Sequence, residues 1–196
     1  MAAEAHDERP VGLTAADRAA QVPAERSSAS ERRRNAPLVL GVVAVLALLA
    51  LRAFVAEPFR IPSESMAPVL QPGDQALVTK IGGAPRRGDL VAFHASRTGD
   101  IMLKRVVAVG GDTVGLEDGV LVVNGRRPAE PYVADPDAID SVYFGPVRVA
   151  KGSLFVLGDN RGNSEDSRDF GTVPADRVIG RATARVWPPS RWGPTR

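Results

Sequence analysis

Two serines stand close together in a stretch of chain that is stiffened by proline. Residues 61–70 read IPSESMAPVL, with Ser63 and Ser65 lying between Pro62 and Pro68. Proline fixes its own φ angle, lacks a backbone donor and disfavours helix in the residue before it. In an extended segment, residues i and i+2 face the same side, so both hydroxyls can face one substrate. The pattern therefore suggests a nucleophilic serine with a second hydroxyl beside it.

A serine hydroxyl is a weak nucleophile until a neighbouring base takes its proton. Histidine is the usual base, but the chain has only His6, in a polar tail, and His94, near the end of an expected strand. Lysine replaces histidine in the Ser-Lys variant of this chemistry. The basic residues include only three lysines, since the rest are arginines, which keep their protons in proteins. Lys80, beside a Gly-Gly pair, and Lys151, in an Ala-Lys-Gly turn, are expected to be solvated, whereas Lys104 is not.

Lys104 interrupts an apolar run that is rich in β-branched residues. Residues 101–109 read IMLKRVVAV, which is typical of a buried strand. With a period of two, Lys104 shares its face with Met102, Val106 and Ala108. An apolar face disfavours the ammonium form and lowers its pKa, as a general base requires. A lysine that reaches solvent from a strand edge, or that pairs with a carboxylate, is the alternative that this segment leaves open.

A second polar segment, residues 158–171, reads GDNRGNSEDSRDFG and is too polar for a core. It can be a surface loop whose Asp, Asn and Ser side chains cap their own backbone. Its acidic residues can also suggest calcium. However, Arg161 and Arg168 supply opposing charge, and the glutamate of an EF-hand loop is missing at the required spacing. We expect no metal ion and no cofactor.

The composition excludes several classes of function. The chain has 196 residues, 44% of them hydrophobic, which allows one domain of ordinary size plus short extra segments. A net charge of +2, without a long basic stripe, gives no reason to expect nucleic-acid binding. The absence of cysteine excludes disulfides, thiol catalysis and cysteine-bound zinc.

The most apolar part of the chain follows a polar tail. Residues 1–35 lack spaced large apolar residues and are expected to be a disordered cytoplasmic tail. Residues 36–56 have Arg52 as their one charge and match the roughly 20 apolar residues of a membrane span. Three arginines, 32–34, directly precede this run, which places the N-terminus in the cytosol. The rival interpretation, a cleaved signal peptide, requires an Ala-x-Ala pattern that the run does not contain.

The remainder, residues 57–196, reads as one β-rich domain outside the cytosol. Glycine and proline punctuate short apolar runs, and Asp118-Gly119 and Asn124-Gly125 are strong signals for tight turns. No soluble helix is expected. The fold class is mainly β: an antiparallel, partly closed β catalytic domain with one N-terminal transmembrane helix. Strands are expected at residues 75–79, 89–93, 101–109, 119–123, 154–157 and 178–186.

Four segments together resemble the bacterial type I signal peptidases, membrane-bound Ser-Lys proteases that remove signal peptides from exported proteins. They occur in the family's order, and the resemblance runs from Arg52 to the C-terminus. The matching segments are residues 52–70, which contain FRIPSESMAPVL, residues 87–93 (RGDLVAF), residues 104–114 (KRVVAVGGDTV) and residues 158–171.

Carried over residue by residue, the resemblance implies that Ser65 is the nucleophile and Lys104 the general base. It also implies three kinds of support: Ser63 as the side-chain oxyanion donor, Ser164 as a hydrogen-bond partner of the lysine, and Asp166 with Arg168 as a brace of the site.

The chain departs from the family pattern at four positions. Glu64 and Val69 stand where Gly and Thr are usual, Gly162 where Asp is common, and Phe170 where Trp or Tyr is common. These departures affect substrate preference and local rigidity more than the reaction. Residues 128–146 are poorly patterned and rich in proline, and the resemblance implies that they are a reduced form of a variable second domain.

The resemblance also implies the partners and the location. The partners are the signal peptides of exported preproteins, with small residues at −1 and −3, and the lipid bilayer, but not nucleic acid. The protein is then a single-pass protein of the plasma membrane with its catalytic domain outside. Two rival functions are a self-cleaving Ser-Lys regulator of the repressor type, which is usually soluble, and a non-catalytic membrane-tethered module. The presence of Ser65, Lys104 and Ser164 argues against the module.

Overall fold

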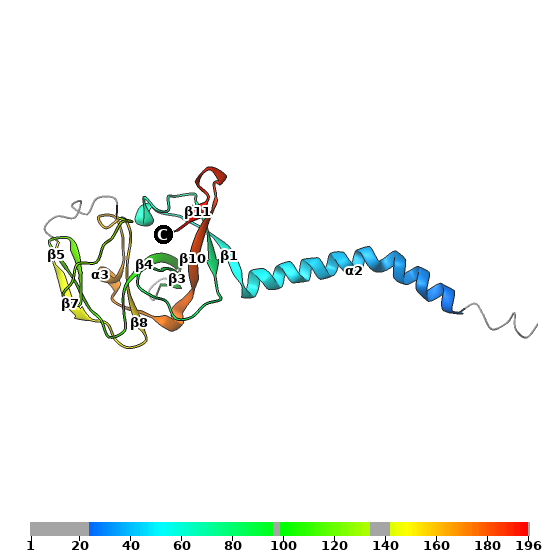
Figure 1. Cartoon of the computed structure of the whole chain (residues 1–196), viewed down its shortest axis with the longest axis horizontal. Helices are drawn as coiled ribbons and strands as arrows, with labels where there is room; N and C mark the ends of the chain where they lie inside the picture. The colour runs from blue at the N-terminus through cyan, green and yellow to red at the C-terminus, as the bar shows by residue number, and fades with distance from the viewer. Residues whose placement is uncertain (1–23, 96–98, 134–141, 196) are drawn as a thin grey trace, which may run out of the picture. The chain divides into compact units, whose positions relative to one another are not determined.

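A computed structural model describes residues 24–95, 99–133 and 142–195 of the chain (Figure 1). The chain divides into two compact units, Met1–Leu49 and Ala50–Arg196, and each is described by itself. Most of the tail predicted at residues 1–35 lies outside the described residues.

Helix α2, Ala24–Phe54, covers most of the apolar run that begins at residue 36. Pro37 lies inside this helix, and Arg52 lies in its last turn. The large apolar side chains of residues 38–49 are each more than half exposed. By length and apolarity, no helix among the described residues qualifies as a membrane span.

The larger sheet of the second unit has eight described strands, and every neighbouring pair is antiparallel. Seven strands follow one another in the order β1-β2-β10-β3-β4-β8-β9, and β11 pairs separately with β10. In chain order these strands are β1 (Ala56–Arg60), β2 (Gln75–Thr79), β3 (Leu90–His94), β4 (Ile101–Val109), β8 (Ser153–Leu157), β9 (Val173–Pro174), β10 (Val178–Trp187) and β11 (Gly193–Pro194). The mainly antiparallel β class predicted from the sequence is therefore confirmed.

A smaller sheet places β5 (Thr113–Glu117) between β6 (Val120–Val123) and β7 (Phe144–Arg148). The turn between β5 and β6 is Asp118-Gly119, and both residues have positive φ, at 54° and 76°. Two consecutive positive φ angles define the hairpin turn that this dipeptide predicts. Strand β7 begins inside the segment 128–146, so that segment contributes a strand to the fold.

Short helical turns connect the strands. They are η1 (Glu64–Met66), α3 (Ser167–Phe170), η3 (Ala175–Arg177) and η4 (Pro189–Arg191). The expectation of no soluble helix is wrong at α3, a single turn that Asp166 caps. The Asp166 carboxylate accepts from the backbone of Arg168, and Asp169 caps the Asp166 backbone in return. Such reciprocal capping satisfies the free donors of a helix start.

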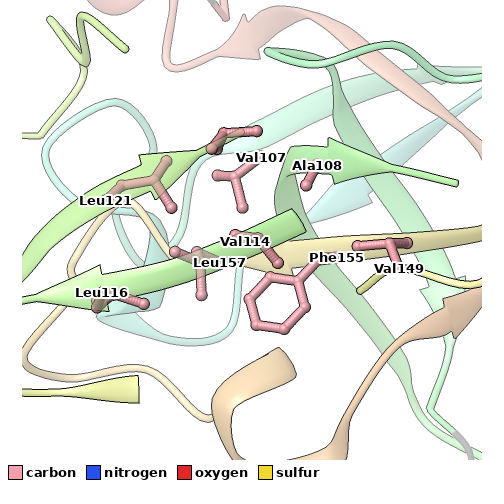
Figure 2. Packing of buried hydrophobic residues seen from close by; sticks show 9 residues of the cluster. Val107, Ala108, Val114, Leu116, Leu121, Val149, Phe155 and Leu157 are labelled. Atoms are coloured by element: carbon pink, nitrogen blue, oxygen red, sulfur yellow. The ribbon is translucent and has the colours of Figure 1, made fainter. Parts of the chain in front are cut away.

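The hydrophobic core consists of three clusters, and strand β4 contributes to all of them. Figure 2 shows the cluster in which the small sheet packs on β4 and β8 around Phe155. Met102 and Val106 pack together in another cluster, as the alternating pattern predicts. Ala108 does not join them, because a bulge between Val106 and Ala108 shifts the register and turns Ala108 towards Phe155.

Candidate active site

Ser63 and Ser65 lie where extended chain enters a short 3₁₀ turn. Ser63 is extended, with φ −136° and ψ 168°, and precedes turn η1, which contains Ser65. The sequence suggested that both serines lie in extended backbone, but only Ser63 does, since Ser65 lies in the 3₁₀ turn. Their hydroxyls nevertheless meet, with Ser63 Oγ donating to Ser65 Oγ at 3.2 Å. Met66 anchors the turn, because its side chain is buried in the core.

Lys104 is buried in strand β4, and only 3% of its surface is exposed. It lines a pocket of about 140 Å³ together with Ser63 and Ser65. The rest of this pocket is mostly apolar and is lined by Phe59, Ile61, Pro62, Met66, Ile101, Met102 and Leu103. The structure thus brings the predicted base and both predicted serines to one cavity, although they lie on different elements.

The environment of Lys104 favours its neutral form. Burial lowers the pKa of its ammonium group below the ordinary 10.5. Asp166 and Glu165 oppose this effect by raising the pKa, whereas Arg168 lowers it further. No ion pair to Lys104 is found within the described residues, so the alternative of a lysine neutralised by a carboxylate is not what the structure has.

Asp166 and Arg168 form an ion pair with two hydrogen bonds near Lys104. Asp166 is fully buried, and its carboxylate accepts from Arg168 Nε and Nη2, both at 2.8 Å, and from Gly158 N at 3.0 Å. The hydrogen bond to Asp166 raises the pKa of Arg168, so the guanidinium stays charged. Arg168 also donates to the carbonyls of Arg161 and Ser164. The pair therefore ties together both ends of the loop that carries Ser164.

The Ser164 side chain and the serine turn both lie close to Gly158. The Ser164 hydroxyl is buried and has no hydrogen-bond partner among the described residues, so the predicted bond to Lys104 is not formed here. A Cβ atom at Gly158 would collide with the Ser164 side chain and would lie 2.6 Å from the Ser65 carbonyl oxygen. Glycine at this position lets the two segments touch. Asn160 N fixes the contact by donating to the same Ser65 carbonyl at 3.0 Å.

A buried ion pair next to Lys104 was not anticipated from the sequence. Arg105 and Asp159 are 2% and 1% exposed, and their side chains form two parallel hydrogen bonds of 2.7 and 2.6 Å. Burial raises the pKa of Asp159, and the bonds from Arg105 oppose that rise. The available signal was Arg105 itself, a second charged residue inside an apolar strand. Asp159 and Asp166 are each bound to an arginine, so neither of these two carboxylates is free for the calcium ion that the residue types of this segment could suggest.

The other lysines and the departures from the family pattern lie outside the pocket. Lys80 pairs with Glu57 at 3.2 Å, and Lys151 is exposed. Phe170 packs against Phe93 with ring centroids 6.2 Å apart, so it fills an aromatic position in the core. Glu64 is exposed, and its carbonyl accepts from Asn160 Nδ2 at 3.3 Å.

Comparison with known proteins identifies the family to which the chain belongs. Residues 34–187 match the family model described as signal peptidase, peptidase S26. The signal peptidase I of Leptolyngbya laminosa is 38% identical over 188 residues, which are 88% of this chain and 91% of that protein. The signal peptidase I of Mycobacterium tuberculosis is 36% identical over 237 residues, covering 89% of this chain and 78% of that protein. A crystal structure of a signal peptidase I from Enterococcus faecalis is 34% identical, covers 52% of this chain and 98% of that chain, and has a TM-score of 0.47.

The chain therefore belongs to the signal peptidase family, peptidase S26. Its activity is that of a signal peptidase I, a serine endopeptidase that removes signal peptides.

Proposed function

We propose that Ser65 and Lys104 are the nucleophile and the general base of this peptidase. The observation that supports the proposal is a shared pocket: Ser65 lines the same small cavity as Lys104, a buried lysine whose pKa is lowered by burial. A neutral lysine can accept the serine proton, which the always-charged arginine cannot do.

The reaction proceeds through an acyl-enzyme. Lys104 takes the proton of Ser65 Oγ as this oxygen attacks the scissile carbonyl carbon. The resulting ammonium gives that proton to the leaving amine when the C–N bond breaks. Water, deprotonated by the same lysine, then attacks the ester carbonyl, and the proton returns to Ser65 as the ester bond breaks. Both steps develop a negative charge on the carbonyl oxygen.

Two donors stabilise that oxyanion: the backbone N–H of Ser65 and the hydroxyl of Ser63. The hydrogen bond between the two serine hydroxyls supports this assignment, because it places the Ser63 oxygen beside the attacking atom. One such donor typically contributes about 3 kcal/mol to transition-state stabilisation. Ser164, Asp166 and Arg168 act as the support of the site, and the unpartnered Ser164 hydroxyl is then available to the lysine.

The substrate is the junction between a signal peptide and an exported protein. The pocket beside Ser65 is mostly apolar and has a volume of about 140 Å³, so it can hold an apolar side chain of the substrate. We assign to it a side chain next to the cleavage point, where the resemblance to the family implies small residues.

We also propose that residues 36–56 anchor the protein in the plasma membrane, with residues 57–196 as the extracytoplasmic peptidase domain. The support is the apolar sequence with its preceding arginines and the exposure of the large apolar side chains from residues 38 to 49. An anchored enzyme holds its serine close to a bilayer that also contains the signal peptide of its substrate.

Substitution of each serine tests these assignments. Ser65→Ala should abolish cleavage of a preprotein by the detergent-solubilised enzyme, because no nucleophile remains. Ser63→Ala should keep a slow turnover, reduced by roughly 10²–10³-fold, because one oxyanion donor remains. If Ser63→Ala were inactive and Ser65→Ala only slow, the two roles would be reversed.

A further inference from the structure

Two side chains from residues 130–132 connect to the loop that supports the serine turn, Glu130 through Arg161 and Tyr132 through Arg105. We propose that Glu130 and Tyr132 are positioning residues, which hold the turn formed by residues 158–161 against the segment that carries Ser65. The proposal rests on the proposed function, since positioning has meaning only if Ser65 reacts. It also changes the interpretation of residues 128–146, whose first residues then contribute to catalysis.

The first connection runs from Glu130 through Arg161. The Glu130 carboxylate accepts from both terminal nitrogens of Arg161, with a distance of 2.8 Å from Nη1 to Oε2. Arg161 is only 5% exposed, and its Nε donates to the Gly158 carbonyl at 3.1 Å. The Arg161 guanidinium therefore binds Glu130 through its two terminal nitrogens and the Gly158 carbonyl through Nε. A planar fork of this kind fixes orientation as well as distance.

The second connection runs from Tyr132 through Arg105. The Tyr132 ring lies over the guanidinium of Arg105, with 4.0 Å between Cζ and the ring centroid. Arg105 in turn holds Asp159, and it also donates to the Gly88 carbonyl at 2.8 Å. The Tyr132 hydroxyl donates to Glu130 Oε1 at 2.8 Å, so the two connections share an acceptor group. Burial and the neighbouring Glu130 raise the pKa of Tyr132, which keeps its hydroxyl protonated as a donor.

The first connection ends at Gly158 and the second at Asp159, which lies between two residues that contact the Ser65 segment. Gly158 lies against the Ser65 carbonyl and the Ser164 side chain. Asn160, which follows Asp159, donates its backbone N–H to the Ser65 carbonyl and its side chain to the Glu64 carbonyl. Arg105 directly follows Lys104 in strand β4. The network thus contacts the segment that carries Ser65 and includes the residue that directly follows Lys104. A shift in residues 130–132 then changes the distance between the proposed base and the proposed nucleophile.

The charges of this network are desolvated, which makes its geometry sensitive to single changes. Arg105, Asp159 and Arg161 are each no more than 5% exposed. Removal of one partner leaves a buried charge unpaired, and its neighbours then rearrange. An error of about 1 Å in the placement of reacting groups can lower a rate by about 100-fold. Conservative variants, which keep the shape of each side chain, are therefore the appropriate probes.

The test uses the full-length enzyme in detergent, a signal-peptide substrate and two conservative variants. Glu130→Gln removes the carboxylate charge, and Tyr132→Phe removes one oxygen but keeps the ring over Arg105. Both should lower kcat, Glu130→Gln by roughly tenfold or more, and leave KM within about twofold of the wild-type value. Matched controls are Glu117→Gln, whose residue makes an exposed pair with Arg127 at 3.8 Å, and Tyr143→Phe, whose residue is 72% exposed. Both controls should keep the wild-type kcat.

Thermal unfolding separates positioning from general stability, and the pH dependence of kcat separates it from electrostatics. Thermal unfolding must show that each variant is folded at the assay temperature, and if Glu130→Gln does not fold, Tyr132→Phe carries the test alone. Positioning predicts that the loss of kcat persists at alkaline pH, where Lys104 is neutral. Recovery of the wild-type kcat at alkaline pH, a change in KM alone, or kcat values equal to those of the controls would each overturn the proposal. Failure of the proposed function gives a different result, namely cleavage that survives Ser65→Ala.

Discussion

At the scale of single residues, the proposed mechanism depends on the protonation state of Lys104. Lys104 can act as a base only while it is neutral, and its burial is the largest influence that favours this state. Among the groups that raise the pKa of Lys104, Asp166 has the largest effect. Both oxygens of its carboxylate, however, accept hydrogen bonds from Arg168. The pairing of Asp166 with Arg168 therefore allows a buried carboxylate to brace the loop while limiting its effect on the lysine.

The pH dependence of cleavage should follow from this lowered pKa. In the proposed mechanism the active form of Lys104 is the deprotonated one, so kcat should rise as the pH increases through its pKa and should fall on acidification. The half-maximal pH should lie below the ordinary lysine value of 10.5. Glu165→Gln removes a carboxylate that raises this pKa, so it should move the rising limb of a plot of log kcat against pH to lower pH. A shift in the opposite direction would contradict the assignment of the limb to Lys104.

At the scale of elements, the site is assembled from a strand, a turn and a loop that are distant in sequence. Strand β4 supplies Lys104, turn η1 supplies Ser65, and residues 158–171 contact the Ser65 turn. The loop packs tightly against the turn at Gly158, where there is no space for a side chain. This contact sets the separation of the two segments.

Replacement of Gly158 by alanine should push the loop away from the serine turn. The added Cβ would overlap the Ser164 side chain and the Ser65 carbonyl, and overpacking of this kind typically costs about 1–3 kcal/mol. Cleavage should fall by roughly tenfold or more because the reacting groups are displaced. Gly83→Ala is the matched control, because a Cβ at Gly83 meets open space. Equal kcat values for the two variants, measured on the same substrate, would show that the Gly158 contact has no role in catalysis.

Much of the element pattern could be predicted from the sequence. The strands at residues 75–79 and 101–109 have the predicted bounds, because they are apolar, β-branched and bounded by turn residues. Strands β1 and β7 were missed, since each contains a proline and each lies at the edge of its sheet. Edge strands tolerate proline because one side of the strand has no partner. Their pairing depends on the neighbouring strand, which a local pattern does not contain.

The site was predicted less completely than the strands. The resemblance located Ser65 and Lys104, and the structure brings them to one pocket. The pair between Arg105 and Asp159 depends on a contact between residues 54 positions apart, so the sequence pattern of β4 could indicate only that Arg105 needs a partner. The contacts of residues 130–132 depend on tertiary structure in the same way. The proline-rich, poorly patterned sequence around them gave no sign of these contacts.

At the scale of the whole molecule, the two units differ in how they bury apolar surface. The unit Ala50–Arg196 buries its apolar side chains in three clusters between its strands. The apolar side chains of residues 38–49 in the other unit remain exposed. Exposed apolar surface of this extent indicates an interaction partner, which we propose to be the lipid bilayer.

The proposed membrane orientation can be tested by protease protection. Tags at the two ends of the chain allow each side to be followed when protease is added to spheroplasts. The arginines at residues 32–34 should keep the N-terminal tag inside and protected, while the C-terminal tag is digested. Lysed spheroplasts, in which both tags should be lost, are the control. Protection of the C-terminal tag in intact spheroplasts would contradict the proposed orientation.

The most direct test of the proposed mechanism is the cleavage rate of a Lys104→Arg variant. Arginine keeps the positive charge and much of the length of lysine, but it cannot act as a base at any ordinary pH. A folded Lys104→Arg enzyme should therefore show no cleavage of a preprotein above background across the whole pH range. Substantial cleavage by this variant would mean that Lys104 acts as a charge, and that Ser65 obtains its base elsewhere.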